Sequence, residues 1–371
     1  ARRIEEIMAA QTNQSPKVSV VIPCFNAERF VGHAIESALR QQDVPVEVIL
    51  VDDGSSDATL RIAAQIAARD GRLRIYKNPE NRGPSYSRNR GIDEARGDWI
   101  ALLDADDFFE ADRLKKILDV AEREQADLVA DNLIIVSEDG EALSYAFSGF
   151  GGRPSKVIGL LDLLDMNRPL VAGVKLGYSK PLMRKDFLRD NELRYNDDIR
   201  VGEDFLLYGK CILKGGRFLL LREAGYCYRL VEGSVTRSDT GGWRTAQLLE
   251  ANRCLMSSLG ETADRDVKRL VARRGRELEA LLLYIELVGL AKKGNWGQVV
   301  ASASRRVDLL RGCNPRRWPR LGNRAGSGYR AARPDLEVDE SLPIFRRPRC
   351  ALAFRPREAG LVPSCVRPNS G

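Results

Sequence analysis

Residues 48–60 read VILVDDGSSDATL, an apolar run followed by several acidic and hydroxyl side chains. Residues 97–114, GDWIALLDADDFFEADRL, repeat the pattern with three aspartates in four positions. Short apolar runs of this kind predict buried strands. Unpaired charge at a buried strand end costs free energy. We therefore expect these carboxylates to face a cation, or a ligand rich in hydroxyls and phosphates.

Strands and helices alternate around these two stretches, with short links between them. The predicted strands are 18–23, 46–53, 73–78, 98–107 and 126–136, and the predicted helices are 27–42, 55–70, 83–97 and 111–125. Ser55 or Ser56 is expected to cap the second helix. This alternation predicts an α/β doubly wound domain with a mostly parallel central sheet and its ligand at the carboxyl ends of the strands.

The rest of the chain is less regular. Residues 1–16 form a polar N-terminal extension, and residues 141–240, rich in Gly and Pro, are expected to form a second half packed beside the sheet. The pattern of residues 241–311 predicts amphipathic helices. Residues 312–371 form a basic tail.

Composition limits the class of protein. A hydrophobic share of 43% with 30% charged residues is typical of a soluble globular chain. No apolar run approaches the length of a membrane span, and the polar first residues do not resemble a signal peptide. Seven cysteines without CxxC spacing predict reduced thiols in a cytoplasmic protein.

The net charge of +7 belongs to the tail. Residues 311–371 hold 13 Arg against 5 acidic residues, a balance of +8, so the preceding 310 residues sum to −1. This segment also holds 8 of the 16 prolines and has little periodicity, which predicts disorder. Contact with an anionic membrane surface is an alternative to a purely solvated tail. A nucleic-acid partner is not expected, because interleaved aromatic residues are absent.

Four blocks in order resemble the family 2 glycosyltransferases of the GT-A fold. They are VSVVIPCFNAERF (18–30), VILVDDGSSDAT (48–59), NRGPSYSRNRGIDEARGDWIALLDADD (81–107) and GEDFLLYGK (202–210). The likeness extends to bacterial exopolysaccharide enzymes of the succinoglycan type. It implies a nucleotide-sugar-binding half over 17–140 and an acceptor-side half with the catalytic base over 141–240.

The aspartates of LLDADD suit a hard cation. On an extended strand end, Asp104 and Asp106 would point to the same side and could share a ligand. Mg²⁺ typically takes one or two carboxylates together with phosphate oxygens. The resemblance implies that Asp106 binds Mg²⁺ or Mn²⁺, that Asp104 meets the ribose or the metal, and that Asp107 supports them. A solvated helix start, where Asp is favoured by the helix dipole, is the alternative.

The first two blocks predict the base pocket. A carboxylate of Asp52 or Asp53 could accept a hydrogen bond from the N3–H of uracil. The resemblance adds Pro23, Phe25 and Asn26 to this pocket and favours Asp53. A strand-to-helix turn with capping side chains is the alternative.

The third block supplies Asn81, Gly83, Arg88 and Asn89. Glycine lets the backbone approach a ligand closely, and an arginine on the following helix could meet a carboxylate or a phosphate. A capped helix with an exposed arginine is the alternative.

The fourth block supplies the base that must take a proton from an acceptor hydroxyl. The single histidine, His33, lies inside the first predicted helix and is expected to serve packing or to lie on the surface, so a carboxylate must act. The resemblance assigns the base to Asp204, with Glu203 beside it, and implies inversion at the anomeric carbon. Asp197 and Asp198 are the next candidates.

Residues 226–237, YCYRLVEGSVTR, resemble the segment that closes such sites. Arg229, Ser234 and Thr236 could neutralise the leaving diphosphate. Many relatives have a histidine here, and this chain has none.

The sequence thus predicts an inverting, metal-dependent hexosyltransferase in the cytoplasm. It would move glucose from UDP-glucose onto a lipid-linked saccharide, and contact of the tail with the inner face of the cytoplasmic membrane is an alternative to a fully soluble enzyme. A sugar nucleotidyltransferase or a Rossmann dehydrogenase would need a Gly-rich loop after the first strand, which VIPCFNAERF lacks. A catalytically inactive scaffold or saccharide-binding protein of the same fold is the rival from another class.

Overall fold

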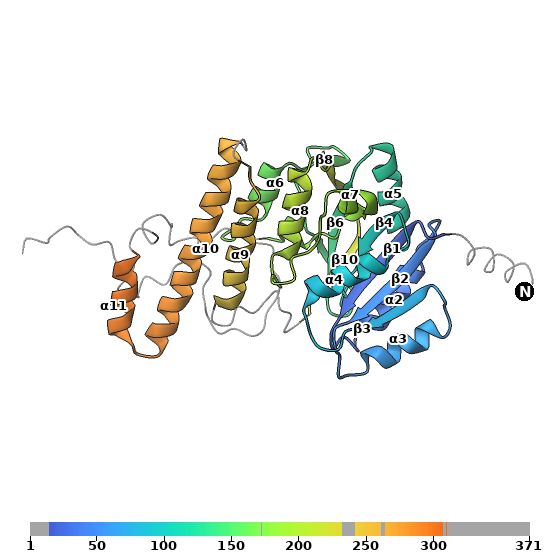
Figure 1. Ribbon diagram of the computed structural model, residues 1–371, viewed down its shortest axis with the longest axis horizontal. Helices are drawn as coiled ribbons and strands as arrows, with labels where there is room; N and C mark the ends of the chain where they lie inside the picture. Colours follow the sequence, from blue (N-terminus) through green and yellow to red (C-terminus); the bar gives the residue numbers. More distant parts are fainter. Residues whose placement is uncertain (1–14, 172, 232–241, 261–263, 307–308, 310–371) are drawn as a thin grey trace, which may run out of the picture.

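The computed structural model describes residues 15–171, 173–231, 242–260, 264–306 and 309 (Figure 1). The strands are β1 (Val18–Cys24), β2 (Val46–Asp52), β3 (Leu73–Lys77), β4 (Trp99–Leu102), β5 (Phe108–Phe109), β6 (Leu128–Val136), β7 (Ala142–Tyr145), β8 (Ser155–Val157), β9 (Leu182–Arg184) and β10 (Phe218–Arg229). The helices are α2 (Val31–Leu39), α3 (Thr59–Ala67), α4 (Pro84–Glu94), α5 (Arg113–Arg123), α6 (Leu160–Met166), the 3-10 helix η1 (Leu176–Tyr178), α7 (Lys185–Asp190), α8 (Glu203–Leu213), α9 (Trp243–Ser257), α10 (Arg265–Lys292) and α11 (Trp296–Arg305).

The strands form one mixed sheet in the order β3-β2-β1-β4-β9-β6-β10-β5, with β7 on β6 and β8 on β10. Neighbours in the group β3-β2-β1-β4 are parallel, as predicted, and so are β6 and β10. Strand β9 lies between the two groups, antiparallel to both β4 and β6. Strands β9 and β10 come from residues 141–240, so this part contributes strands to the sheet and does not only pack beside it.

Close packing fixes helix α4 on the sheet. Strand β2 is buried at all seven positions, as its apolar run predicts. Helix α4 lies so close to β1 that a Cβ at Gly91 would stand 2.3 Å from Cγ1 of Val21. Gly91 is therefore needed for this approach, and the position of α4 determines where Arg88 points.

The aspartates of LLDADD lie in a turn and not on an extended strand. Strand β4 ends at Leu102, and the backbone N–H of Asp107 donates to the carbonyl of Asp104 at 3.0 Å. The alternation that would align Asp104 with Asp106 does not apply beyond the strand, so that part of the prediction is wrong.

Helix α3 begins four residues later than predicted and has no serine cap. Its first residue is Thr59, whose backbone N–H donates to Oδ1 of Asp57 at 3.0 Å. Ser55 and Ser56 instead hydrogen-bond to the loop after β1 through Asn26.

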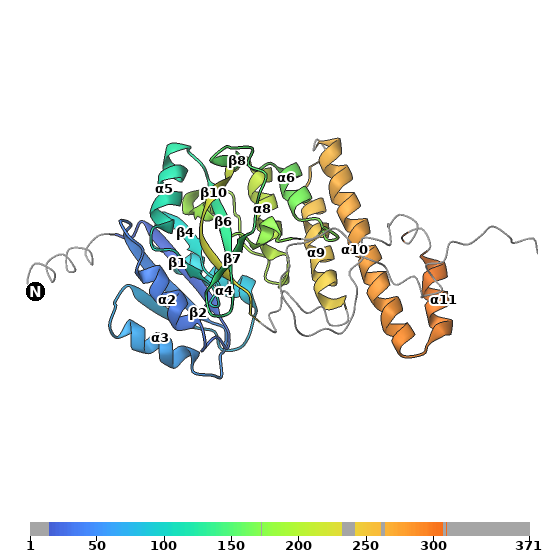
Figure 2. The same cartoon turned by 180° about the vertical axis from the view of Figure 1, so that it is seen from behind.

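The helical region extends from one side of the sheet (Figures 1 and 2). Helix α10 has 28 residues and is about 42 Å long. Helix α11 packs on the end of α10 in a small apolar cluster of Leu283, Leu287 and Val299, separate from the main core. The predicted disordered tail, 312–371, lies outside the described residues.

Two composition-based predictions can be compared with the described residues. No helix among them has the length and apolar character required to span a bilayer. Their cysteines, Cys24, Cys211, Cys227 and Cys254, are free thiols.

Candidate active site

Two buried cations join three carboxylates at the carboxyl edge of the sheet. Arg88 lies 2.8 Å from Asp104 and 2.7 Å from Glu203. Lys180 lies 3.1 Å from Asp104 and 2.6 Å from Asp204. We call these five residues the charge network. The network contains three carboxylates and two cationic side chains. It connects Asp104, at the end of a strand, to Asp204, the predicted catalytic base a hundred residues later.

The five members come from four different local structures. Arg88 lies in α4, and Asp104 in the turn after β4. Glu203 and Asp204 open α8, where the helix dipole favours acids. Lys180 follows η1, and its carbonyl accepts a hydrogen bond from Nη2 of Arg113 at 2.8 Å. The network is therefore a product of tertiary packing.

Burial and charge act in opposite directions on the titration of this network. Burial would raise the pKa of Asp104, but Lys180 and Arg88 more than offset it, so that pKa lies below its ordinary value. Burial would likewise lower the pKa of Lys180, yet Asp104 and Asp204 hold it above its ordinary value. Burial, reinforced by the charge of Asp204, raises the pKa of Glu203.

Asp204 is held on both sides. Its Oδ1 accepts a hydrogen bond from the Tyr195 hydroxyl at 2.8 Å, and its Oδ2 accepts one from Lys180 at 2.6 Å. Each carboxylate oxygen has a second lone pair, so an acceptor hydroxyl could still be bound. The structure thus fixes the orientation of Asp204 and leaves its role as the base a prediction.

Asp106 and Asp107 differ sharply in their surroundings. The buried Asp107 accepts hydrogen bonds from the Tyr226 hydroxyl at 2.7 Å and from the Arg229 N–H at 2.8 Å. Its pKa is raised by burial and by Asp106 and Asp104. No side chain among the described residues hydrogen-bonds to the Asp106 carboxylate. Burial, together with Asp104, raises the pKa of Asp106 to about 6.

These surroundings fit a divalent cation held mainly through Asp106. In the part of the chain that the structure describes, no group of three or more His, Cys, Asp or Glu side chains could hold a metal ion alone. Mg²⁺ with one or two carboxylates and phosphate oxygens needs no such group. The carboxylate of Asp106 is the one available to it, whereas Asp104 is paired with two cations and Asp107 anchors the turn.

Asp53 organises a loop. Its carboxylate accepts from the side chain of Asn78 at 2.7 Å and from the backbone N–H groups of Arg82 and Gly83 at 3.1 and 2.7 Å. Asp52 is also fully buried and accepts from the N–H of Ser55 at 3.1 Å. The preference for Asp53 over Asp52 as the uracil contact gains no support from this geometry.

The loop after β1 is more open. Phe25 is exposed, Pro23 is half-buried, and Asn26 adopts a positive φ of 48°. The side chain of Asn26 accepts from the N–H of Ser56 at 2.9 Å, which holds the ends of β1 and β2 together. Phe25 is therefore available to a nucleotide base.

The residues of the third block divide into two groups. Gly83 has φ of 93° and lies under Arg200, whose Nη1 donates to Asn81 at 3.3 Å. Asn89 is buried and clamps the backbone of Tyr195 through its amide nitrogen at 2.9 Å and its oxygen at 3.0 Å. Asn89 thus positions the tyrosine that contacts Asp204, and Arg88 is a buried network member, not an exposed helix residue.

Arg229 supports the aspartate turn. Its guanidinium donates to the carbonyl of Asp106 at 2.8 Å and contacts Nδ1 of His33 at 3.1 Å, between the rings of Phe30 and Phe108. The prediction that Arg229 contacts the diphosphate gains no support. His33 is exposed, with its ring centroid 4.4 Å from that of Phe108, and partial burial together with Arg229 lowers its pKa.

Some predicted residues lie elsewhere. Ser234 and Thr236 fall outside the described residues. Asp197 accepts from Asn89 at 2.8 Å, and Asp198 is exposed.

Lys180, Tyr195 and Tyr226 are the site residues that sequence reasoning missed. Lysine is rarely buried unless it is paired, so the one available signal was a lysine among apolar neighbours in GYSKPLM. Tyr226 lies far along the chain from its partner Asp107, and no motif marks Tyr195, although its partner Asp204 follows nine residues later.

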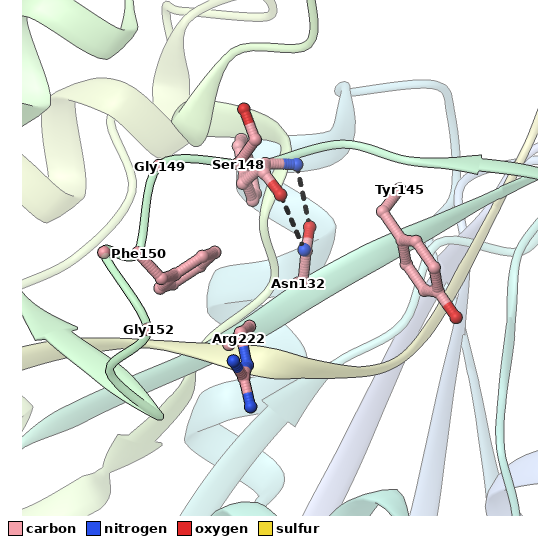
Figure 3. A pocket seen from close by; sticks show the side chains of 9 residues that line it. Asn132, Tyr145, Ser148, Gly149, Phe150, Gly152 and Arg222 are labelled. Carbon is pink, nitrogen blue, oxygen red and sulfur yellow. Dashed lines mark hydrogen bonds between the residues drawn. The ribbon is translucent and has the colours of Figure 1, made fainter.

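A cavity of about 340 Å³ lies outside the charge network (Figure 3). Tyr145, Phe150 and Arg222 contribute to its lining, and Asn132 holds its loop through the backbone of Phe147 at 2.9 Å. This cavity is thus distinct from the carboxylate cluster.

Comparison with known proteins reveals relatives. The family model described as Glycosyl transferase family 2 matches residues 19–170. Succinoglycan biosynthesis protein ExoO of Rhizobium meliloti is 39% identical over 222 residues, which is 60% of this chain and 63% of ExoO. ExoU of the same organism, also a succinoglycan biosynthesis protein, is 33% identical over 267 residues, which is 70% of this chain and 75% of ExoU. The chain thus spans less than two thirds of the length of ExoO, and it spans three quarters of the length of ExoU.

Solved structures confirm the predicted fold class. S. aureus TarS 1-349 in complex with UDP-GlcNAc superposes with a TM-score of 0.56, covering 81% of this chain and 82% of that chain at 20% identity. The chain has the GT-A fold, here with a mixed sheet and a C-terminal helical region.

Proposed function

We propose that this chain, which belongs to glycosyl transferase family 2, transfers a hexose from a nucleoside diphosphate sugar to a saccharide hydroxyl. One observation carries the proposal. Lys180 lies within 3.1 Å of Asp104, the donor-side carboxylate, and within 2.6 Å of Asp204, the proposed base. Donor and base groups are therefore adjacent, as a direct displacement requires.

The proposed donor is UDP-glucose and the proposed acceptor is a lipid-linked saccharide in exopolysaccharide assembly. The relatives named for succinoglycan biosynthesis support this class of product. TarS, whose fold is similar, was solved with UDP-GlcNAc, which supports a uridine nucleotide. A lipid-linked acceptor would bring the reaction to the inner face of the cytoplasmic membrane. Residues 17–140 would bind the donor and residues 141–240 the acceptor.

The proposed reaction is a single displacement with inversion. The acceptor oxygen forms a bond to the anomeric carbon as the bond from that carbon to the diphosphate oxygen breaks. Asp204 takes the hydroxyl proton, and the nucleoside diphosphate leaves with the bonding electrons. Tyr195 and Lys180 orient Asp204, and Glu203 holds Arg88 beside Asp104.

Asp106, with Asp104 near it, would hold Mg²⁺ or Mn²⁺ together with the donor diphosphate. When bound, the ion would neutralise the negative charge that develops on the leaving group. The raised pKa of Asp106 supports this assignment, because a buried carboxylate without a protein partner is stabilised by a cation.

The test is release of UDP from a panel of UDP-sugars, with and without a saccharide acceptor and with EDTA. We expect acceptor-dependent release from UDP-glucose that EDTA abolishes. Full activity in EDTA would overturn the metal assignment. No turnover of any sugar nucleotide, with retained saccharide binding, would favour an inactive binding protein of the same fold.

A further inference from the structure

Helices α10 and α11 form a hairpin at the end of the molecule farthest from the sheet (Figures 1 and 2). The inner face of α11 packs on α10 through the buried Val299, and Ser302 donates to Glu286 at 3.0 Å. The hairpin therefore has its own small apolar cluster, and the outer face of α11 is not needed to hold it together.

That outer face carries two large apolar side chains in the open. Trp296 is 50% exposed and Val300, one helical turn later, is 65% exposed. Residues four apart lie on the same side of a helix, so the two side chains form a single apolar stripe. Exposed apolar side chains that cluster in this way mark interaction surfaces, whereas scattered ones do not.

The charge around the stripe is mainly positive. Residues 287–306 contain four basic residues, Lys292, Lys293, Arg305 and Arg306, and no acidic one. All four are exposed. One acid, Glu286, lies 3.9 Å from Arg306. Asp308 follows in the sequence, and from residue 311 onward there are 13 Arg against 5 acids.

We infer that the outer face of α11 and the lysines before it dock on an anionic membrane surface. Tryptophan combines an apolar ring with a polar N–H and suits the membrane–water interface. Lysine and arginine beside it attract anionic headgroups. This is a shallow peripheral contact of the amphipathic type. It rests on the proposed function, because a lipid-linked acceptor would lie at that surface.

Salt dependence follows from the two parts of this contact. The basic residues act through a field that salt screens over about 8 Å at physiological ionic strength. Removal of one lysine should weaken binding about fivefold. Removal of the apolar stripe should leave only the part of the vesicle affinity that salt weakens.

The experiment is co-sedimentation of the full chain with vesicles of phosphatidylcholine and phosphatidylglycerol, or of phosphatidylcholine alone. The stripe variant is Trp296→Ser with Val300→Ser. Its matched control is Trp243→Ser, because Trp243 is 47% exposed at the start of another helix. The charge variant is Lys292→Gln with Lys293→Gln, and its control is Lys214→Gln on the exposed end of α8.

We expect binding to the anionic vesicles only, weakened by both test variants and unchanged by both controls. Brominated lipids should quench fluorescence of the wild type more than that of Trp296→Phe. Absence of wild-type binding, or binding that neither test variant weakens, would overturn the inference. A concentration-dependent dimer in sedimentation velocity that the stripe variant abolishes would overturn it too, by assigning the face to a second copy.

Donor turnover measured without vesicles separates this inference from the proposed function. The stripe variant and the charge variant should release UDP in solution as the wild type does, because α11 is remote from α4 and α8, which carry the charge network. Vesicle binding by a chain that turns over no sugar nucleotide would refute the proposed function alone.

Discussion

Replacing Lys180 by methionine tests the charge network most directly. The side chain keeps a similar length, but Asp104 and Asp204 lose the ammonium that lies 3.1 and 2.6 Å away. Removing one partner of a buried ion pair costs about 3–5 kcal/mol. Arg88 remains 2.8 Å from Asp104 and compensates in part. We therefore expect the free energy of unfolding in urea to fall by about 3 kcal/mol.

The stability loss of the same variant should depend on pH. The network lowers the pKa of Asp104. Its stabilisation is therefore present above the ordinary aspartate pKa, and the stability difference between variant and wild type should shrink only below about pH 4.

Two controls make the result interpretable. Lys180→Arg keeps the charge and should lose less stability than Lys180→Met. Lys214→Met removes an exposed lysine and should not change the stability. A Lys180→Met protein with wild-type stability would refute Lys180 as a stabilising partner of Asp104 and Asp204.

Three further outcomes follow. Asp204→Asn should reduce transfer about 10²–10⁴-fold with UDP-sugar binding little changed, and Glu203→Gln should do less; reversed effects in steady-state assays would assign the base to Glu203. Asp106→Asn should abolish transfer and weaken divalent-dependent UDP binding. Because the pKa of Asp106 is raised to about 6, wild-type stability falls as the pH rises through that value. Urea unfolding in EDTA should therefore show the variant more stable by about 1–3 kcal/mol at pH 8 and equal below about pH 4. Truncation at residue 311 should leave a folded enzyme with wild-type circular dichroism, and an unfolded product would contradict the tail as an appendage.

The strands of the first half could be predicted because each is encoded locally. An apolar run such as β2 can be satisfied only inside a sheet with both faces covered. Strand β9 could not be predicted in this way. It has three residues, and its place between β4 and β6 depends on contacts with segments distant in the chain.

The candidate site residues also divide into those with a local sequence signal and those without one. Asp104, Asp106 and Asp204 were found from motifs, which are local. Lys180 was not, because a lysine becomes a network member only when folding brings two carboxylates to it. The predicted alignment of Asp104 and Asp106 is wrong because β4 ends at Leu102, two residues before Asp104.

The excess of negative charge in the site suggests why two buried strands of this chain end in aspartates. The network holds three carboxylates against two cations, and Asp106 adds another carboxylate beside it. Such an excess raises the free energy of the folded chain, and the raised pKa values of Asp106 and Glu203 reflect that cost. A core selected for stability alone would replace these side chains. Their arrangement instead suits a ligand that brings positive charge with it, so stability is lowered at the place where the donor would bind.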